Sequence, residues 1–94
     1  MSPIGFGRSA ASVTGIASWF RSPAGVSAAG PGLRAALGPG WRGMRVTVTG
    51  PAGSAVVTLG DWMQRDRLID LDAPVFVRVC GALALGICRV TVTS

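Results

Sequence analysis

The chain has 94 residues and a formal net charge of +5, with 49% hydrophobic and 14% charged residues. A chain of this length forms one domain at most and buries only about 60 to 65% of the surface that its unfolded form exposes. The sequence contains no His, Lys, Glu, Tyr or Asn, so the usual general bases and most metal ligands are missing. We therefore expect no enzyme activity, no cofactor and no metal site.

The positive charge is concentrated in the first part of the chain. Residues 1–60 contain five arginines and no acidic residue, whereas four arginines balance four aspartates in residues 61–94. Such an asymmetry is typical of a tail that contacts an anionic partner. The five arginines of the first part are Arg8, Arg21, Arg34, Arg42 and Arg45.

No segment is long enough to predict a membrane span. A spanning helix needs about 18 to 20 continuous apolar residues, and the longest candidate, residues 79–87, is far shorter and contains two glycines. Residues 1–45 are rich in Arg and Ser and free of acids, as in organelle transit peptides. An organelle protein with an uncleaved presequence is therefore one alternative.

Glycine and proline interrupt residues 1–43 throughout. The packing of such a stretch on itself does not offset the conformational entropy that it loses when it becomes ordered. Apolar spacing predicts short helices over residues 9–20 and 32–37, but both are too short to be stable alone in water. We expect residues 1–43 to form an extended arm that becomes ordered against a partner.

The pattern changes at residue 45 to an alternation of polar and apolar residues. Val46 and Val48 share one face of residues 45–49, which is typical of a half-buried strand. Turn-forming residues follow at 50–54, and a β-branched run resumes at 55–59. These features predict a hairpin.

A helix and two further strands are predicted after the hairpin. Asp61, with Gln64 three residues later, has the spacing of a helix N-cap and its capping-box partner, which predicts a helix over residues 62–70. Residues 75–80 and 87–94 alternate again and are predicted strands.

The order β-β-α-β-β predicts an α+β fold. We expect a small β-rich domain over residues 44–94, a mostly antiparallel sheet with one helix. It is preceded by the extended, basic, Gly/Ala/Pro-rich arm over residues 1–43.

The two cysteines, Cys80 and Cys88, are eight residues apart. If the valines of the two last strands share one face, paired positions sum to an odd number, and the two sulfur atoms point to opposite faces. This favours two free thiols. A bulge at Gly81 or Gly86 would instead allow a disulfide, so the redox state stays open.

The four aspartates are interpreted as structural rather than catalytic. Asp61 has the predicted capping role, Asp66 and Asp70 have helical spacing on a solvated face, and Asp72 follows in a turn. This interpretation is preferred to a carboxylate pair for acid-base chemistry.

Aromatic residues accompany the arginines of the predicted arm. Guanidinium groups and aromatic rings together suit nucleic acid, but they also suit an arm whose aromatic residues fill grooves of a protein partner. The arginines do not form the runs typical of nucleic-acid tails, which favours protein. We expect partner contacts from Trp19, Phe20 and Trp41, and anion or rim contacts from Arg8, Arg21, Arg34, Arg42 and Arg45.

These features favour a non-enzymatic structural or assembly subunit whose basic arm lies across neighbouring subunits of a large complex, including copies of itself. A minor or cementing protein of a virus or phage particle is the favoured example. The first alternative is an RNA-contacting accessory protein of a ribosome or other ribonucleoprotein, and the second is a small organelle-complex subunit. A virion or cytoplasmic assembly is the favoured location.

Overall fold

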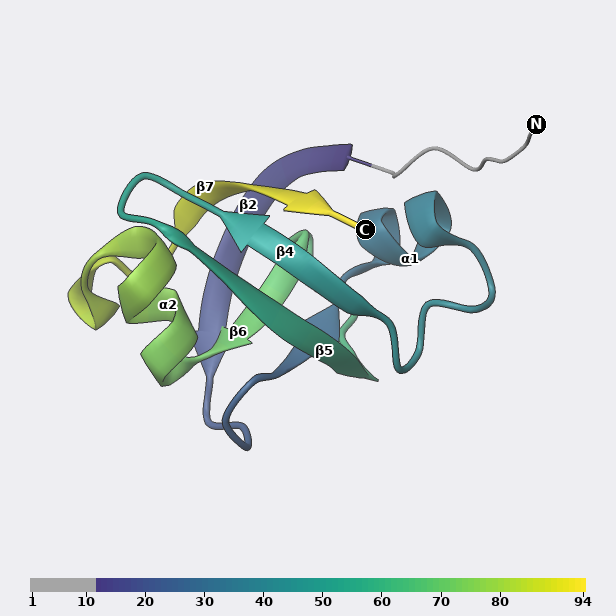
Figure 1. Cartoon of the computed structure of the whole chain (residues 1–94), viewed down its shortest axis with the longest axis horizontal. Helices are drawn as coiled ribbons and strands as arrows, with labels where there is room; N and C mark the ends of the chain where they lie inside the picture. Colours follow the sequence, from purple (N-terminus) through teal and green to yellow (C-terminus); the bar gives the residue numbers. More distant parts are fainter. Residues whose placement is uncertain (1–11) are drawn as a thin grey trace.

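The computed structural model describes residues 12–94, which fold into a closed six-stranded barrel (Figure 1). The strands follow one another around the barrel in the order β2-β6-β3-β5-β4-β7. In chain order they are β2 (Ser12–Phe20), β3 (Val26–Ala29), β4 (Arg45–Thr49), β5 (Ser54–Trp62), β6 (Ile69–Asp72) and β7 (Cys88–Thr93).

Two short helices and one 3-10 turn lie in the connections between strands. Helix α1 (Pro31–Leu37) follows β3, and helix α2 (Ala73–Cys80) follows β6 and leads into the 3-10 turn η1 (Leu83–Leu85). Figure 1 shows α1 and α2 at opposite ends of the barrel. Within residues 12–94, neither helix has the length and apolar content needed to cross a bilayer.

The barrel combines parallel and antiparallel pairs. The pairs β2–β6 and β3–β5 are parallel, and the other four neighbouring pairs are antiparallel. Parallel neighbours cannot be joined by a tight hairpin and need a crossover connection. The segment carrying α1 and β4 supplies one such crossover, between β3 and β5.

The core fills the barrel interior with alternate residues of the strands. Because side chains of a strand point alternately to its two faces, one set from each strand faces inward. Leu33 of α1 and Phe76 of α2 are fully buried and join the same core. Burying each such side chain contributes about 1.5 to 3 kcal/mol. The fully buried strand residues include Val46, Val48, Val57, Leu59, Ile69, Leu71, Val90 and Val92.

The fold class expected from the sequence is wrong. The strands close into a barrel instead of forming an open β-β-α-β-β sheet, and part of the predicted extended arm supplies β2, β3 and α1. Two glycines of this segment allow close packing. A Cβ atom at Gly15 would lie 2.9 Å from the Cβ of Leu68, and one at Gly30 would collide with the carbonyl oxygen of Arg67. Gly15 and Gly30 therefore mark close contacts in the barrel.

Two predicted secondary-structure elements are of the wrong type, one a predicted helix and the other a predicted strand. The predicted helix over residues 62–70 is wrong, because this segment ends β5, loops outward and begins β6. Its backbone bonds to other strands: the Met63 amide donates to the Ala29 carbonyl at 3.1 Å, and the Leu68 amide donates to the Ile16 carbonyl at 2.8 Å.

The predicted strand over residues 75–80 is part of helix α2. Its buried residues, Phe76, Val79 and Cys80, have the spacing of one helix face. The helix predicted over residues 9–20 is also wrong, because the described part of it forms strand β2. The predictions at 32–37, 45–49, 55–59 and 87–94 correspond to α1, β4, β5 and β7.

Cys80 and Cys88 form a disulfide with a Cα–Cα distance of 5.9 Å, which corrects the preference for free thiols. The argument that paired positions sum to an odd number fails, because Cys80 ends helix α2 and does not lie on a strand paired with β7. The chain turns back through η1, and Gly81, with φ of 112°, donates its amide to the Val77 carbonyl at 2.8 Å. The bond ties the end of α2 to the start of β7.

Candidate functional site

A polar row crosses the outer face of four adjacent strands. Ser18 on β2 is in register with Asp70 on β6, Asp70 with Ala28 on β3, and Ala28 with Asp61 on β5. Ile69 and Leu71, the neighbours of Asp70, face the core, so Asp70 faces outward. We call Ser18, Asp70, Ala28 and Asp61 the polar row.

A buried hydrogen bond fixes one half of the polar row. The Ser18 hydroxyl donates to Asp70 Oδ1 at 2.7 Å, and each of the two residues is only 6% exposed. A carboxylate removed from water this far requires a donor, and hydroxyl-to-carboxylate bonds are short and strong. Ser18 therefore holds the Asp70 carboxylate in one orientation.

Of the polar row, only Asp61 is exposed, because Ser18, Asp70 and Ala28 are each at most 6% exposed. Asp61 lies near the end of β5, where its Oδ1 accepts the Trp62 amide at 2.8 Å. Only the small side chain of Ala28 separates Asp61 from Asp70 along the row. Two strand spacings place the two aspartate Cα atoms roughly 10 Å apart. The row thus carries one nearly buried carboxylate, Asp70, and one exposed carboxylate, Asp61.

Trp62 directly follows Asp61 and carries an exposed aromatic ring at the end of β5. Its register partner, Ala29, belongs to the core, so the ring lies on the opposite side of the strand from the polar row. The Trp62 side chain is 45% exposed, and the guanidinium carbon of Arg34 lies 5.3 Å from the ring centroid. Arg34, on helix α1, also donates from Nη2 to the Met63 carbonyl at 3.1 Å. Helix α1 thus places a cation against the ring at the end of β5.

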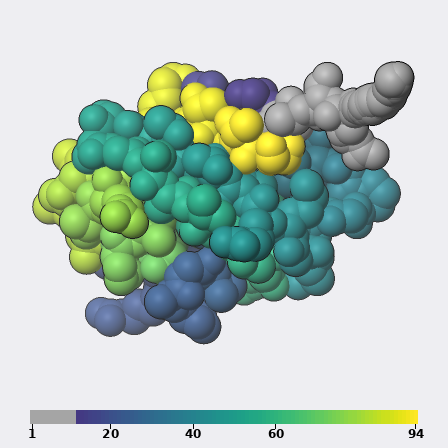
Figure 2. Space-filling view, viewed as in Figure 1, coloured from purple at the N-terminus to yellow at the C-terminus, as the bar shows by residue number. Residues whose placement is uncertain are grey.

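A second cation and ring pair lies in the connection from α1 to β4. The guanidinium carbon of Arg42 lies 4.7 Å from the Trp41 ring centroid, and Nη1 of Arg42 donates to the Gly60 carbonyl at 2.8 Å. We call Arg34, Trp41, Arg42 and Trp62 the Arg-Trp surface. Figure 2 shows the segment from α1 to β4, in blue and teal, at one end of the molecule. A depression of about 460 Å³ there is lined by Pro31, Arg34, Ala35, Gly38, Pro39 and Trp41.

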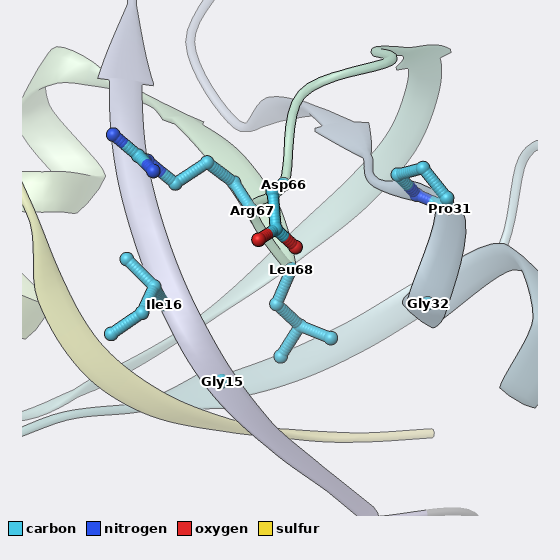
Figure 3. A pocket seen from close by; sticks show the side chains of 7 residues that line it. All are labelled: Gly15, Ile16, Pro31, Gly32, Asp66, Arg67 and Leu68. Atoms are coloured by element: carbon cyan, nitrogen blue, oxygen red, sulfur yellow. The ribbon is translucent and has the colours of Figure 1, made fainter.

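A further pocket of about 330 Å³ lies between β2 and the start of α1 (Figure 3). In Figure 3 the side chains of Asp66 and Leu68 lie between the two elements, whereas Arg67 extends toward β2 and away from Pro31. No group of three or more His, Cys, Asp or Glu side chains in residues 12–94 is arranged to hold a metal ion. The pocket therefore has a single carboxylate and little further chemistry.

The three aromatic residues predicted to contact a partner have different environments. The Trp19 indole donates to the Leu83 carbonyl at 3.2 Å and packs against the core, so this side chain stabilises the barrel itself. Phe20 is half-buried at the end of β2, and Trp41 is partly buried against the core.

The arginines predicted to contact anions are spread over the molecule. Arg34 and Arg42 are brought together by the Arg-Trp surface. Arg45 is exposed at the start of β4, and Arg21 is exposed directly after β2. Arg8 lies outside the described residues.

The roles expected for the aspartates need correction. Asp61 accepts an amide at the end of a strand instead of capping a helix, and Asp70 is nearly buried on β6 instead of lying on a solvated helix face. Asp72 is fully buried at the start of α2. The Ser18–Asp70 pair was missed because its members are 52 residues apart. The alternation Ile-Asp-Leu-Asp at residues 69–72 was the available signal for a strand there.

Comparison with known proteins gives a match of fold only. No protein-family model and no curated protein sequence matches the chain. Among solved structures, it is similar to a point mutant of an expansin from Clavibacter michiganensis, crystallised in complex with cellohexaose. The TM-score is 0.72 at 17% identity over 88% of this chain, which spans half the length of that protein. The closed barrel described above therefore resembles the double-psi β-barrel fold of expansins.

Proposed function

We propose that this domain binds a polysaccharide chain at the end of β5, where Asp61 and Trp62 are exposed. The observation that carries the proposal is an exposed carboxylate next to an exposed tryptophan at the end of that strand. Carboxylates accept hydrogen bonds from hydroxyl groups, and an exposed indole offers a flat apolar surface to a sugar ring. Both features suit a ligand that is rich in hydroxyl groups and has apolar ring faces.

Two further observations support this class of ligand. The expansin that shares the barrel fold is in complex with cellohexaose, an oligosaccharide. In addition, the Cys80–Cys88 disulfide favours an oxidising compartment, because disulfides persist in secreted and extracellular proteins and are rare in the cytosol. Structural polysaccharides occur in such surroundings.

The assembly role expected from the sequence stays a prediction with less support. It depended on an arm without a fold of its own, but β2, β3 and α1 lie in the segment expected to form that arm. No feature of residues 12–94 points specifically to a virus particle, a ribosome or an organelle complex.

The test is a titration of the whole chain with cellohexaose, in which calorimetry or NMR measures the binding. Replacing Trp62 with Ala, or Asp61 with Asn, should weaken binding by about tenfold or more if these groups contact the sugar. Leu85→Ala is the matched control, because Leu85 is 56% exposed on η1, outside the proposed site. Equal affinity of the Trp62 variant and the wild type would place the ligand elsewhere, and failure to bind any oligosaccharide or insoluble glucan would reject the function.

The absence of enzyme activity also stays a prediction. Asp61 and Asp70 lie on one face with one strand between them, and paired carboxylates are the groups that glycoside hydrolases use. The check is the release of reducing sugars during long incubation of the protein with the glycans that it binds. Products that disappear in both Asp61→Asn and Asp70→Asn would show that the expectation is wrong.

A further inference from the structure

We propose that the polysaccharide is acidic and that the Arg-Trp surface recognises its anionic groups. This inference deepens the proposed function and rests on it. Trp62 belongs to the Arg-Trp surface and directly follows Asp61 in the proposed sugar-binding site. A chain bound at Asp61 and Trp62 would therefore continue over Arg34 and Arg42.

Both guanidinium groups are held in place before any ligand arrives. Arg34 is fixed by the Gly30 and Met63 carbonyls, and Arg42 is fixed by the Gly60 carbonyl. Each also stacks on a tryptophan ring. Such contacts reduce the entropy lost on binding. Since a guanidinium carries five N–H donors, these bonds leave donors on both groups for a carboxylate.

The surface has excess positive charge. The contacts shown for Arg34 and Arg42 within residues 12–94 are with carbonyl groups and tryptophan rings, and none of the four aspartates is among them. The nearest acid along the chain, Asp61, uses one carboxylate oxygen to accept the Trp62 amide. Arg45 is exposed close by along the chain, at the start of β4. An anionic ligand would therefore meet several cations and few acidic groups that compete with it for them.

The spacing of the two guanidinium groups also suits an anionic chain. The loop between β5 and β6 adds little charge here, because exposed Arg65 and Asp66 balance and Arg67 extends away from the start of α1. The carbonyl groups that hold Arg34 and Arg42 belong to residues three positions apart, so they are separated by no more than about 10 Å. This separation suits repeated anionic groups along an extended sugar chain.

Acidic sugars are favoured over nucleic acid by two observations. The cations are isolated residues and do not form the runs typical of nucleic-acid-binding segments. In addition, a guanidinium already covers part of each tryptophan ring, which reduces the aromatic area left for stacking bases. The barrel fold is also shared with a protein that is in complex with an oligosaccharide.

The experiment compares an acidic with a neutral oligosaccharide of equal length, hexagalacturonate and cellohexaose, using the whole chain. The wild type should bind hexagalacturonate about tenfold more tightly at low salt, because two exposed charge pairs are added. The preference should shrink as salt is raised. In the double variant Arg34→Gln/Arg42→Gln the ratio of the two affinities should fall to about one, whereas Arg34→Lys/Arg42→Lys should keep part of the preference.

The matched control is Arg78→Gln, which removes the same charge from an exposed position on α2 at the other end of the barrel. It should keep the wild-type ratio. Circular dichroism and thermal unfolding establish that each variant is folded. If the double Gln variant does not fold, the double Lys variant tests the inference.

The outcomes separate the two proposals. Binding of cellohexaose without preference for hexagalacturonate, or a preference that persists in the Gln variant, would overturn this inference and leave the proposed function standing. Binding of neither sugar would remove both. Tighter binding of single-stranded RNA than of hexagalacturonate, lost in the same variant, would assign the surface to nucleic acid and overturn the inference.

Discussion

The hydroxyl of Ser18 donates to the carboxylate of Asp70 across the parallel pair of β2 and β6. The bond connects two segments that the sequence placed in different parts of the molecule, one in an arm and the other in a helix. Both residues are almost inaccessible to water, although they lie on the outer face of the barrel. The pair therefore contributes to stability by holding β2 and β6 in register.

Replacing Ser18 with Ala should lower the free energy of unfolding by about 1 to 3 kcal/mol, because the Asp70 carboxylate loses its donor while it remains desolvated. Chemical denaturation measures the change. Ser54→Ala, at an exposed position of β5, should change stability by less than about 0.5 kcal/mol. Similar values for the two variants would mean that the Ser18–Asp70 bond contributes little.

Gly30 and Gly32 provide a matched pair for the close packing near α1. A Cβ at Gly30 would collide with the Arg67 carbonyl oxygen, whereas one at Gly32 would meet nothing within 4 Å. We expect Gly30→Ala to destabilise the protein by more than about 2 kcal/mol. Gly32→Ala lies in a helix and should stabilise it by roughly 0.5 to 1 kcal/mol. Thermal unfolding of both variants checks the opposite signs, and equal shifts would contradict the close approach.

Truncation of Trp62 and of Phe76 should lower stability by very different amounts. Phe76 is fully buried, so Phe76→Ala should cost about 3 to 5 kcal/mol of stability. Trp62 is 45% exposed and contacts Arg34, so Trp62→Ala should cost no more than about 1 kcal/mol. A large loss of stability in the Trp62 variant would show that the ring supports the core.

Removing the disulfide by Cys80→Ala/Cys88→Ala should cost about 2 to 3 kcal/mol, the loop-closure entropy of a short loop. Denaturation with and without a reducing agent measures the effect. The reducing agent should lower the stability of the wild type by a similar amount and leave the variant unchanged. A wild type that is insensitive to complete reduction would contradict a stabilising role for the bond.

The sequence predicted elements whose two faces differ clearly in polarity. The alternation at residues 45–49 predicted β4, because Val46 and Val48 face the core while their neighbours face water. Strands β2 and β3 were missed, because their buried positions are alanine and serine and β2 also contains Gly15, which lies close to Leu68; such small residues also resemble a flexible tail. The run at residues 75–80 was ambiguous, because a short apolar segment fits a strand as well as a helix.

The candidate site was recovered only in part from the sequence. Arg34, Trp41 and Arg42 are close in sequence and were singled out, since a local cluster of cations and aromatic residues is visible without a fold. Trp62 and Asp61 were assigned to a helix. Ser18 and Asp70 could be placed together only by the barrel register, which depends on strand pairings between distant segments.

The pairing of β2 with β7, from Ser12 with Thr93 to Ala17 with Cys88, has a consequence for how the molecule is made. During synthesis, β2 leaves the ribosome long before the strand that completes its hydrogen bonds. Contacts between such distant positions slow folding, typically to milliseconds or seconds. Until β7 arrives, the open ladder of β2 can pair with other chains, so newly made protein is most exposed to aggregation in this interval.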